Sequence, residues 1–228
     1  MDASGNLTLA VSLIDTAIED LQQTRRLLDP PGPVVKLPDA VALPQTIYKL
    51  PRETNTAISA FYGPPSKNPS YLEWFSFPTQ TLLYSRTGAE LINRVGDTRD
   101  DHKTHKLLAK RLESALAQIY VTLGHDRFLK EGWHVYGGSH NFRTKTGGSS
   151  LSTHAWGAAV DMCPSDNSYQ QRSTTFSVEA INIMESYGFL SGGRAWSKDW
   201  MHFQAVIPSI SAGSYYATYG LPKNILAA

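Results

Sequence analysis

The chain has 228 residues, with 21 basic and 20 acidic side chains and a formal net charge of +1. This balance offers no electrostatic basis for binding a polyanion, so we expect neither a nucleic-acid partner nor an anionic membrane partner. Hydrophobic residues make up 41% of the chain and charged residues 18%, which is typical of a folded globular protein. A single cysteine, Cys163, excludes an intramolecular disulfide framework.

The beginning of the chain predicts one amphipathic helix. Apolar side chains recur at helical spacing from Leu9 to Leu28, with charged side chains largely between them, and prolines follow from Pro30. We therefore assign residues 1–29 to an N-terminal amphipathic helix, whose apolar face must be buried against something, such as a larger assembly. The segment lacks the basic region of a secretory signal, and no apolar run is long enough to form a transmembrane segment.

The next segment is rich in proline. Ten of the 13 prolines lie between Pro30 and Pro78, and prolines restrict the backbone to extended conformations. We expect residues 30–78 to form a strap or linker, with a short helix from Thr54 to Tyr62. Residues 79–228 are then predicted to form one folded domain.

Within that domain, short strands alternate with helices. A helix is predicted from about Asp101 to Gly124, because leucines and isoleucines recur on one face and the glycine supplies a stop. Further segments are predicted as strands at 133–138, 157–162 and 200–207 and as a helix at 178–187. This order predicts an α+β fold, with a small antiparallel sheet and flanking helices.

One short segment, LSTHAWGAAVD, carries two side chains of the types that commonly bind metal ions. His154 and Asp161 are seven residues apart, and a bend at Trp156-Gly157 followed by a strand would bring them together. A catalytic zinc site takes three protein ligands and leaves a fourth position open. The best third candidate is His202, which begins an apolar strand. The sequence therefore predicts that His154, Asp161 and His202 bind Zn²⁺.

An acidic residue lies close to the third ligand candidate. A carboxylate held near a zinc-bound water, but not bound to the metal, can take its proton and deliver it to a leaving amine. Asp199 is the candidate for this role, since it lies three residues before His202. The alternative is a solvated acid at the edge of a strand.

The motifs resemble the zinc D-alanyl-D-alanine carboxypeptidases and L-alanyl-D-glutamate endopeptidases. That family shares a Ser-x-His-x6-Asp motif and a later acid-x-x-His. Here the motifs read Ser152-Thr153-His154 with Asp161, and Asp199-Trp200-Met201-His202. The resemblance spans roughly Gly132 to Ile207 and extends more weakly to the helix before it. Several members carry Glu-Trp-Trp-His in the second motif, so the shorter carboxylate of Asp199 must come closer to the water.

The resemblance implies a role for each matching residue. His154, Asp161 and His202 would be the zinc ligands, and Asp199 would be the general base and acid. Arg143, which ends the matching segment from Gly137, would bind the substrate carbonyl and its developing oxyanion. Ser152 would be a secondary substrate contact. A surface ion pair for Arg143 and a turn hydrogen bond for Ser152 are the alternatives.

The predicted function is that of a zinc metallopeptidase. The resemblance implies hydrolysis of an amide bond in the peptide stem of bacterial peptidoglycan, of the D,D-carboxypeptidase or the L-alanyl-D-glutamate endopeptidase type. In the absence of a signal peptide we expect a phage-type cell-wall lysin, an endolysin released from the host cytoplasm or an enzyme carried in a virion through its N-terminal helix. The alternatives are a non-catalytic zinc-binding or wall-binding module and a cytoplasmic D-alanyl-D-alanine dipeptidase.

Overall fold

The computed structural model describes residues 46–79, 81–84, 90–93 and 103–228. The chain divides into two compact units, Met1–Lys36 and Leu37–Ala228, and only the second contains described residues. The helix expected within residues 1–29 and the first part of the proline-rich strap lie outside the described residues. The division into three parts, with a boundary at residue 79, stays a prediction.

A six-stranded sheet organises the second unit, with the strand order β4-β3-β6-β7-β9-β8. β3 runs parallel to β6, and the other neighbouring strands are antiparallel. The predicted α+β class is confirmed, with one parallel pair added to the small antiparallel sheet. The strands are β3 (Thr81–Tyr84), β4 (Glu90–Asn93), β6 (Val135–Gly138), β7 (Ala159–Met162), β8 (Leu190–Ser191) and β9 (His202–Gln204).

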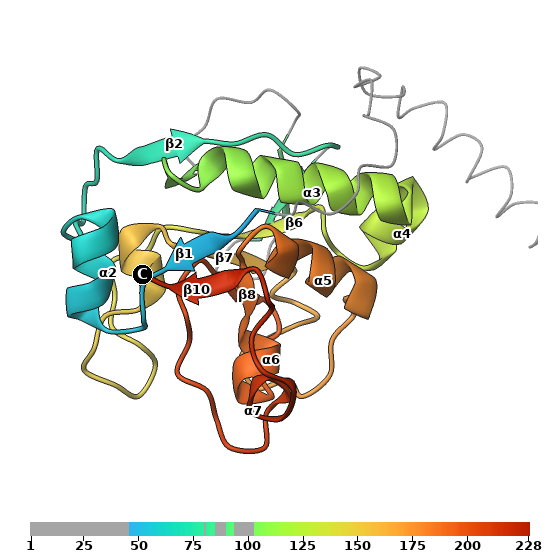
Figure 1. The fold of residues 1–228 in the computed structure, drawn as a ribbon. Coiled ribbons are helices and arrows are strands. Elements are labelled where there is room, and N and C mark those ends of the chain that lie inside the picture. The colour runs from blue at the N-terminus through green and yellow to red at the C-terminus, as the bar shows by residue number, and fades with distance from the viewer. Residues whose placement is uncertain (1–45, 80, 85–89, 94–102) are drawn as a thin grey trace, which may run out of the picture. The chain divides into compact units, whose positions relative to one another are not determined.

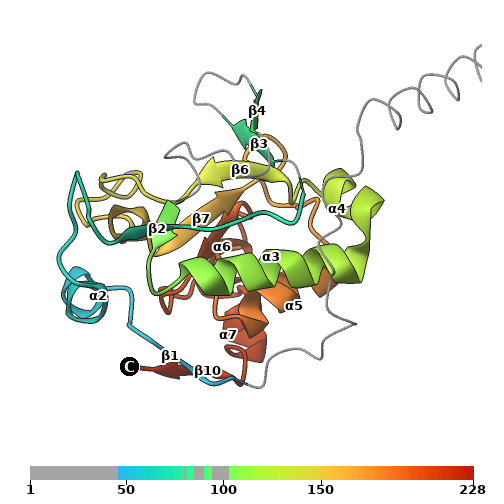
Figure 2. The same cartoon turned by 90° about the horizontal axis from the view of Figure 1, so that it is seen from above.

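Helices α3 (Ala109–Leu123) and α5 (Val178–Ser186) pack against each other along one side of this sheet (Figures 1 and 2). The predicted apolar face of α3 is buried, and the helix stops at Gly124 as expected, where φ is 75°. The core between helices and sheet includes an aromatic cluster, in which Trp133 stacks on Phe176 and also contacts Phe203. α4 (His125–Lys130) follows α3 directly.

The start of α3 differs from the prediction. Residues from about 101 were expected to be helical, but Lys103–His105 form strand β5, antiparallel to β2 (Leu72–Trp74). Thr104 Oγ1 donates a hydrogen bond to the Gly157 carbonyl at 2.8 Å. His105 Nε2 lies 3.1 Å from the carbonyl oxygen of Tyr62. These distant partners fix an extended backbone, and helical periodicity in the sequence contains no information about them.

The described part of the proline-rich segment belongs to the same core. The short helix predicted at Thr54 to Tyr62 is confirmed as α2 (Asn55–Tyr62), which Thr54 caps by accepting from the Ala57 amide at 3.2 Å. Its Ile58 and Tyr62 are buried. β1 (Tyr48–Leu50) pairs in parallel with β10 (Ile225–Ala227), so the two ends of the described chain lie side by side (Figure 1).

The remaining predicted elements are present with shorter bounds. The strands predicted at 133–138, 157–162 and 200–207 correspond to β6, β7 and β9, and the helix predicted at 178–187 corresponds to α5. A 3₁₀ helix, η1 (Thr153–Trp156), and two short helices, α6 (Gly192–Trp196) and α7 (Tyr215–Tyr219), complete the described unit. Among the described residues, no helix has the length and apolar character needed to cross a bilayer.

Candidate active site

The turn that carries His154 is formed by η1. The Ser152 side chain caps it by accepting from the His154 amide at 3.4 Å. Gly157 ends it with a φ of 62°, in the left-handed region that glycine adopts without strain. A Cβ atom at this glycine would lie 2.7 Å from Leu72 Cδ2 and 3.1 Å from the His105 backbone nitrogen, so the neighbouring chain leaves little room for a side chain here. The chain therefore turns sharply from His154 into β7, as the bend predicted at Trp156-Gly157 requires.

Asp161 and His202 are placed by strand pairing. They lie opposite each other in the antiparallel β7–β9 register, which brings their Cβ atoms close together on one face. Their neighbours Val160 and Phe203 alternate to the other face and are fully buried in the core. The sheet therefore directs two of the three predicted ligands to the same point above η1.

The three side chains meet. His154 Nε2 lies 3.2 Å from Asp161 Oδ1, and His202 Nδ1 lies 3.1 Å from the same oxygen. The two histidine nitrogens are 3.1 Å apart. Metal-ligand atoms of all three residues lie within 4.8 Å of one another, a group that could hold a metal ion.

Hydrogen bonds behind the rings fix which nitrogen of each histidine is free. His154 Nδ1 lies 2.7 Å from the Ser139 carbonyl oxygen, to which it must donate, so Nε2 keeps its lone pair. Gln204 donates its amide to the Val206 carbonyl at 3.1 Å, and its oxygen lies 3.0 Å from His202 Nε2. His202 Nε2 therefore donates, and Nδ1 faces the group with a lone pair.

With both histidines neutral, as metal binding requires, the consequence is a group of three electron-pair donors without a proton between them. Such a group is stable only with a cation at its centre. Two imidazole nitrogens and a carboxylate oxygen are the ligand types that Zn²⁺ takes at three-ligand catalytic sites. The residues present therefore fit a zinc ion.

Without a metal, a proton takes the place of the cation. Burial disfavours the charged form of His202, but the hydrogen bond to Asp161 and the charges of Asp161 and Asp199 outweigh this and raise the pKa of His202 to about 9. Burial likewise disfavours the Asp161 carboxylate, yet the charges and hydrogen bonds of His154 and His202 hold the pKa of Asp161 well below its usual range. The site thus keeps its carboxylate ionised and attracts positive charge.

Asp199 lies in the turn between α6 and β9. Its φ is 64°, a left-handed conformation that aspartate tolerates better than most residues. The residue is only 8% exposed, and its Oδ1 is buried without a hydrogen-bond partner among the described residues. Burial raises the pKa of Asp199 to about 6, with His202 lowering it and Asp161 raising it further. A buried acid with an unused oxygen beside a metal-ligand group is placed to exchange protons.

Two aromatic residues support this turn. A Cβ atom at Gly193 would come within 2.1 Å of the Trp200 ring, so α6 can pack against that ring only because it has no side chain there. Trp196, from the same helix, packs against His202 with ring centroids 5.6 Å apart. Its Nε1 donates to the Ser209 carbonyl at 2.7 Å. The turn with Asp199 is therefore held on both sides.

The loop with Arg143 folds back onto the site. Asn141 N donates to the His154 carbonyl and Ser152 N donates to the Arg143 carbonyl, both at 3.0 Å. Arg143 Nη1 donates to the adjacent Thr144 carbonyl at 3.2 Å, and its charge lowers the pKa of Asp199. Ser152 makes the turn hydrogen bond that was the alternative to substrate contact. Substrate roles for Arg143 and Ser152 stay predictions.

The sequence patterns did not identify the groups that orient the ligands. The Ser139 carbonyl carries no sequence signal, because any residue could supply it. Gln204 could have been found, since it lies two residues after His202 on a strand and therefore on the same face. Thr153, which donates to the Gln204 oxygen at 3.2 Å, completes this outer layer.

Comparisons with known proteins bear on the same segment. Searches of curated proteins and of solved structures found no match for the chain. Residues 146–205 match the sequence model of a zinc-dependent peptidase family described as D-alanyl-D-alanine carboxypeptidase. The matched segment includes Ser152, the three ligand candidates and Asp199, whereas Arg143 lies just before it. The resemblance between this part of the chain and the D-alanyl-D-alanine carboxypeptidase family is thereby confirmed.

Proposed function

We propose that the protein is a zinc peptidase that hydrolyses an amide bond in the peptide stem of bacterial peptidoglycan. One observation carries the proposal. Three electron-pair donors, from His154, Asp161 and His202, converge beside a buried carboxylate, Asp199, with an unused oxygen. A site built only to hold a metal has no need of the fourth group. The family match over residues 146–205 supports the choice of substrate class.

The chemistry divides among the side chains. A zinc ion bound by the three ligands would lower the pKa of a water molecule and polarise the substrate carbonyl. Asp199 accepts the proton of the attacking water and delivers it to the departing amine. In the metal-free chain burial raises its pKa to about 6, and the same burial favours return of the proton from the Asp199 carboxyl to the amine. The Arg143 guanidinium binds the carbonyl oxygen as negative charge develops on it.

Asp199→Asn is the most direct test of this mechanism. Asparagine keeps the size of the side chain and tolerates the left-handed backbone at this position, but it cannot accept the proton. We expect zinc content to stay unchanged and hydrolysis to fall by about 10²- to 10⁴-fold, the range of general acid–base catalysis. The measurement is release of stem-peptide fragments from purified peptidoglycan by mass spectrometry, alongside zinc content.

The matched control is Asp126→Asn, which changes an exposed aspartate in the first turn of α4. It should leave both zinc content and hydrolysis as in the unmodified chain. Full hydrolysis by the Asp199→Asn variant would show that Asp199 has no part in the mechanism. Release of peptide fragments that persists after zinc is removed with a chelator would show that the metal has none.

The same fragments identify the substrate and separate the alternatives. Free D-alanine as the product indicates a D,D-carboxypeptidase, and an opened L-alanyl-D-glutamate bond indicates an endopeptidase. Cleavage of free D-alanyl-D-alanine, with intact walls left untouched, indicates a dipeptidase. Zinc binding without any cleavage indicates a non-catalytic module. A phage-type lysin is the setting we propose for wall cleavage, tested by lysis of cells when the enzyme is added from outside.

A further inference from the structure

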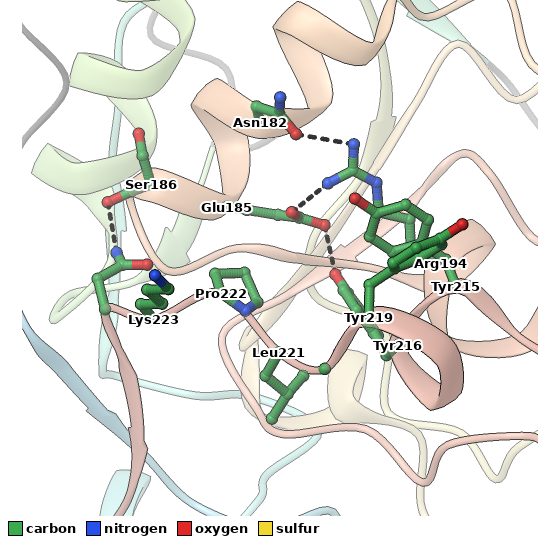
Figure 3. A pocket seen from close by; sticks show the side chains of 12 residues that line it. Asn182, Glu185, Ser186, Arg194, Tyr215, Tyr216, Tyr219, Leu221, Pro222 and Lys223 are labelled. Carbon is green, nitrogen blue, oxygen red and sulfur yellow. Dashed lines mark hydrogen bonds and ion pairs between the residues drawn. The ribbon is translucent and has the colours of Figure 1, made fainter.

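A hollow lies beside α6, in contact with α5, α7 and the loop that leads into β10 (Figure 3). Its volume is about 270 Å³. The peptidase mechanism uses none of its residues. α6 nevertheless contributes to both places, because it carries Arg194 into the hollow and Trp196 against the ligand His202. We call this hollow the tyrosine pocket, after Tyr215, Tyr216 and Tyr219 in its wall.

The floor of the tyrosine pocket is a buried polar cluster whose members satisfy one another. Arg194 Nη1 donates to Glu185 Oε2 at 2.5 Å, and Arg194 Nη2 donates to Asn182 Oδ1 at 2.7 Å. The Tyr216 hydroxyl donates to the other oxygen of Glu185. The opposite charges of Glu185 and Arg194 cancel. This floor therefore presents no unbalanced charge to a ligand.

The mouth of the pocket is aromatic and open. Tyr215 is 44% exposed and Tyr219 is 73% exposed, and their rings lie with centroids 4.8 Å apart at an interplanar angle of 44°. The Arg194 guanidinium lies 4.5 Å from the Tyr215 ring centroid and holds that ring in place. Adjacent exposed rings beside a hollow form a contiguous apolar patch, which is typical of a contact surface.

Polar groups around the mouth have no internal partner. Among the described residues, none makes a hydrogen bond to the Tyr215 or Tyr219 hydroxyl, to Asn182 Nδ2 or to Lys223 Nζ. These groups supply hydrogen-bond donors, and the two phenol oxygens also accept. Only Lys223 carries a charge. The mouth thus offers aromatic faces surrounded by mostly neutral hydrogen-bonding groups.

We propose that the tyrosine pocket binds a neutral saccharide. A pyranose ring has an apolar C–H face that stacks on an aromatic ring, and hydroxyl groups at its edge that exchange hydrogen bonds with groups such as those above. With a volume of about 270 Å³ the pocket lies slightly below the usual size of small-molecule sites, so we expect it to hold one sugar ring rather than a longer stretch of a glycan. Lys223 is the only group at the mouth that could pair with an anion, because the Arg194 donors that point toward the floor are already engaged by Glu185 and Asn182.

The natural ligand would be the glycan strand of the cell wall, an identification that rests on the proposed function. In peptidoglycan the peptide stem is attached covalently to the glycan. A ligand site for sugar and a hydrolytic site for peptide on two sides of one short helix would hold both parts of the same polymer. Saccharide binding would then raise the local concentration of stems at the hydrolytic site.

The test measures saccharide binding separately from hydrolysis. The full chain is titrated with chitotetraose, a neutral oligosaccharide of N-acetylglucosamine, and binding is followed by calorimetry. We expect a dissociation constant on the order of 1 mM or tighter. Tyr219→Ala should weaken binding by about fivefold or more, and Tyr219→Phe, which keeps the ring and loses only the hydroxyl, should weaken binding by less than Tyr219→Ala does. Phe61→Ala is the control, since Phe61 is an exposed aromatic residue of α2.

The outcomes are distinct from those of the peptidase test. Absence of chitotetraose binding, or equal binding by the Tyr219→Ala variant, overturns the saccharide site even if the enzyme cleaves stem peptides. Binding of glycerol phosphate oligomers in place of chitotetraose also overturns it. A Tyr219→Ala variant that cleaves a sugar-free stem peptide normally but intact walls slowly supports it. If the chain binds chitotetraose but hydrolyses no stem peptide, the saccharide site is supported and the proposed peptidase function is ruled out.

Discussion

Two buried polar clusters flank α6, and they follow opposite principles of construction. In the floor of the tyrosine pocket each acceptor faces a donor, as the contacts of Glu185 with Arg194 and Tyr216 show. In the ligand group three acceptors face one another, and nearby Asp199 has an oxygen that finds no partner in the described part of the chain. The first cluster is complete with the residues of the chain alone, whereas the second is complete only with a cation.

The difference separates structural from chemical roles. A satisfied buried network stabilises one arrangement of the chain, and it loses stability when a member is removed. A group of unsatisfied acceptors adds little to the fold and supplies affinity for something from outside. Burial alone would not have told them apart, because Arg194, Glu185, His154 and His202 are all almost fully buried. The two clusters are distinguished by whether each acceptor is paired with a donor.

The largest effect on folding is expected at the satisfied cluster. Glu185→Ala leaves the Arg194 guanidinium buried without its carboxylate, and we expect the free energy of unfolding to fall by about 3 to 5 kcal/mol. Chemical denaturation of the metal-free chain measures it. Glu179→Ala is the matched control. Glu179 pairs with Arg127 at 3.5 Å with about half of each side chain exposed, so its loss should change stability by about 0 to 1 kcal/mol.

Equal losses in the two variants would show that the cluster under the tyrosine pocket is no more structural than a surface ion pair. His154→Ala extends the comparison to the ligand group. We expect it to change the stability of the metal-free chain by less than Glu185→Ala and to abolish the stabilisation that zinc provides.

These two clusters also differ in how far the sequence predicts them. The ligand group follows from two local motifs, because a histidine and an aspartate flank one turn and a second histidine begins a strand. The Glu185–Arg194 contact joins a helix to the helix after the next strand, and no spacing rule connects the two residues. Their pairing depends on how α5 and α6 pack, which is a property of the whole fold.

The same limit applies to the secondary structure. The predicted face of α3 and its stop at Gly124 were correct, since both are local properties of the sequence. The predicted start near residue 101 was wrong, because Thr104 and His105 bond to Gly157 and Tyr62, which lie far away in the chain. Periodicity identifies an element from its own residues, and tertiary contacts then decide where it begins.

An intermediate effect is expected in the layer behind the ligands. Gln204→Met keeps the volume of the side chain but removes the oxygen that orients His202. We expect zinc affinity to fall by about 10- to 100-fold, as is typical for groups that orient a metal ligand. Competition with a chelator measures it. Gln118→Met, at a buried glutamine of α3 bonded to Thr122, is the control and should leave affinity unchanged. Equal affinity in the two variants would mean that Gln204 does not position the ring.

The smallest effect concerns pH, and it tests directly whether the ligand group attracts a cation. The pKa of His202 is raised to about 9 in the metal-free chain, so at neutral pH a proton occupies the place of the metal and zinc must displace it. Displacement of this proton should therefore contribute about a tenfold rise in apparent zinc affinity between pH 7 and pH 8, and nearly one released proton per zinc bound at pH 7, in addition to the protons that zinc-bound water releases. Calorimetry in buffers of different ionisation enthalpy counts the protons. An ordinary histidine, with a pKa near 6.5, would contribute only about a quarter of a proton to the same total at pH 7. That result would mean that the three acceptors do not hold the proton, and the contrast between the two clusters would then rest on hydrogen-bond geometry alone.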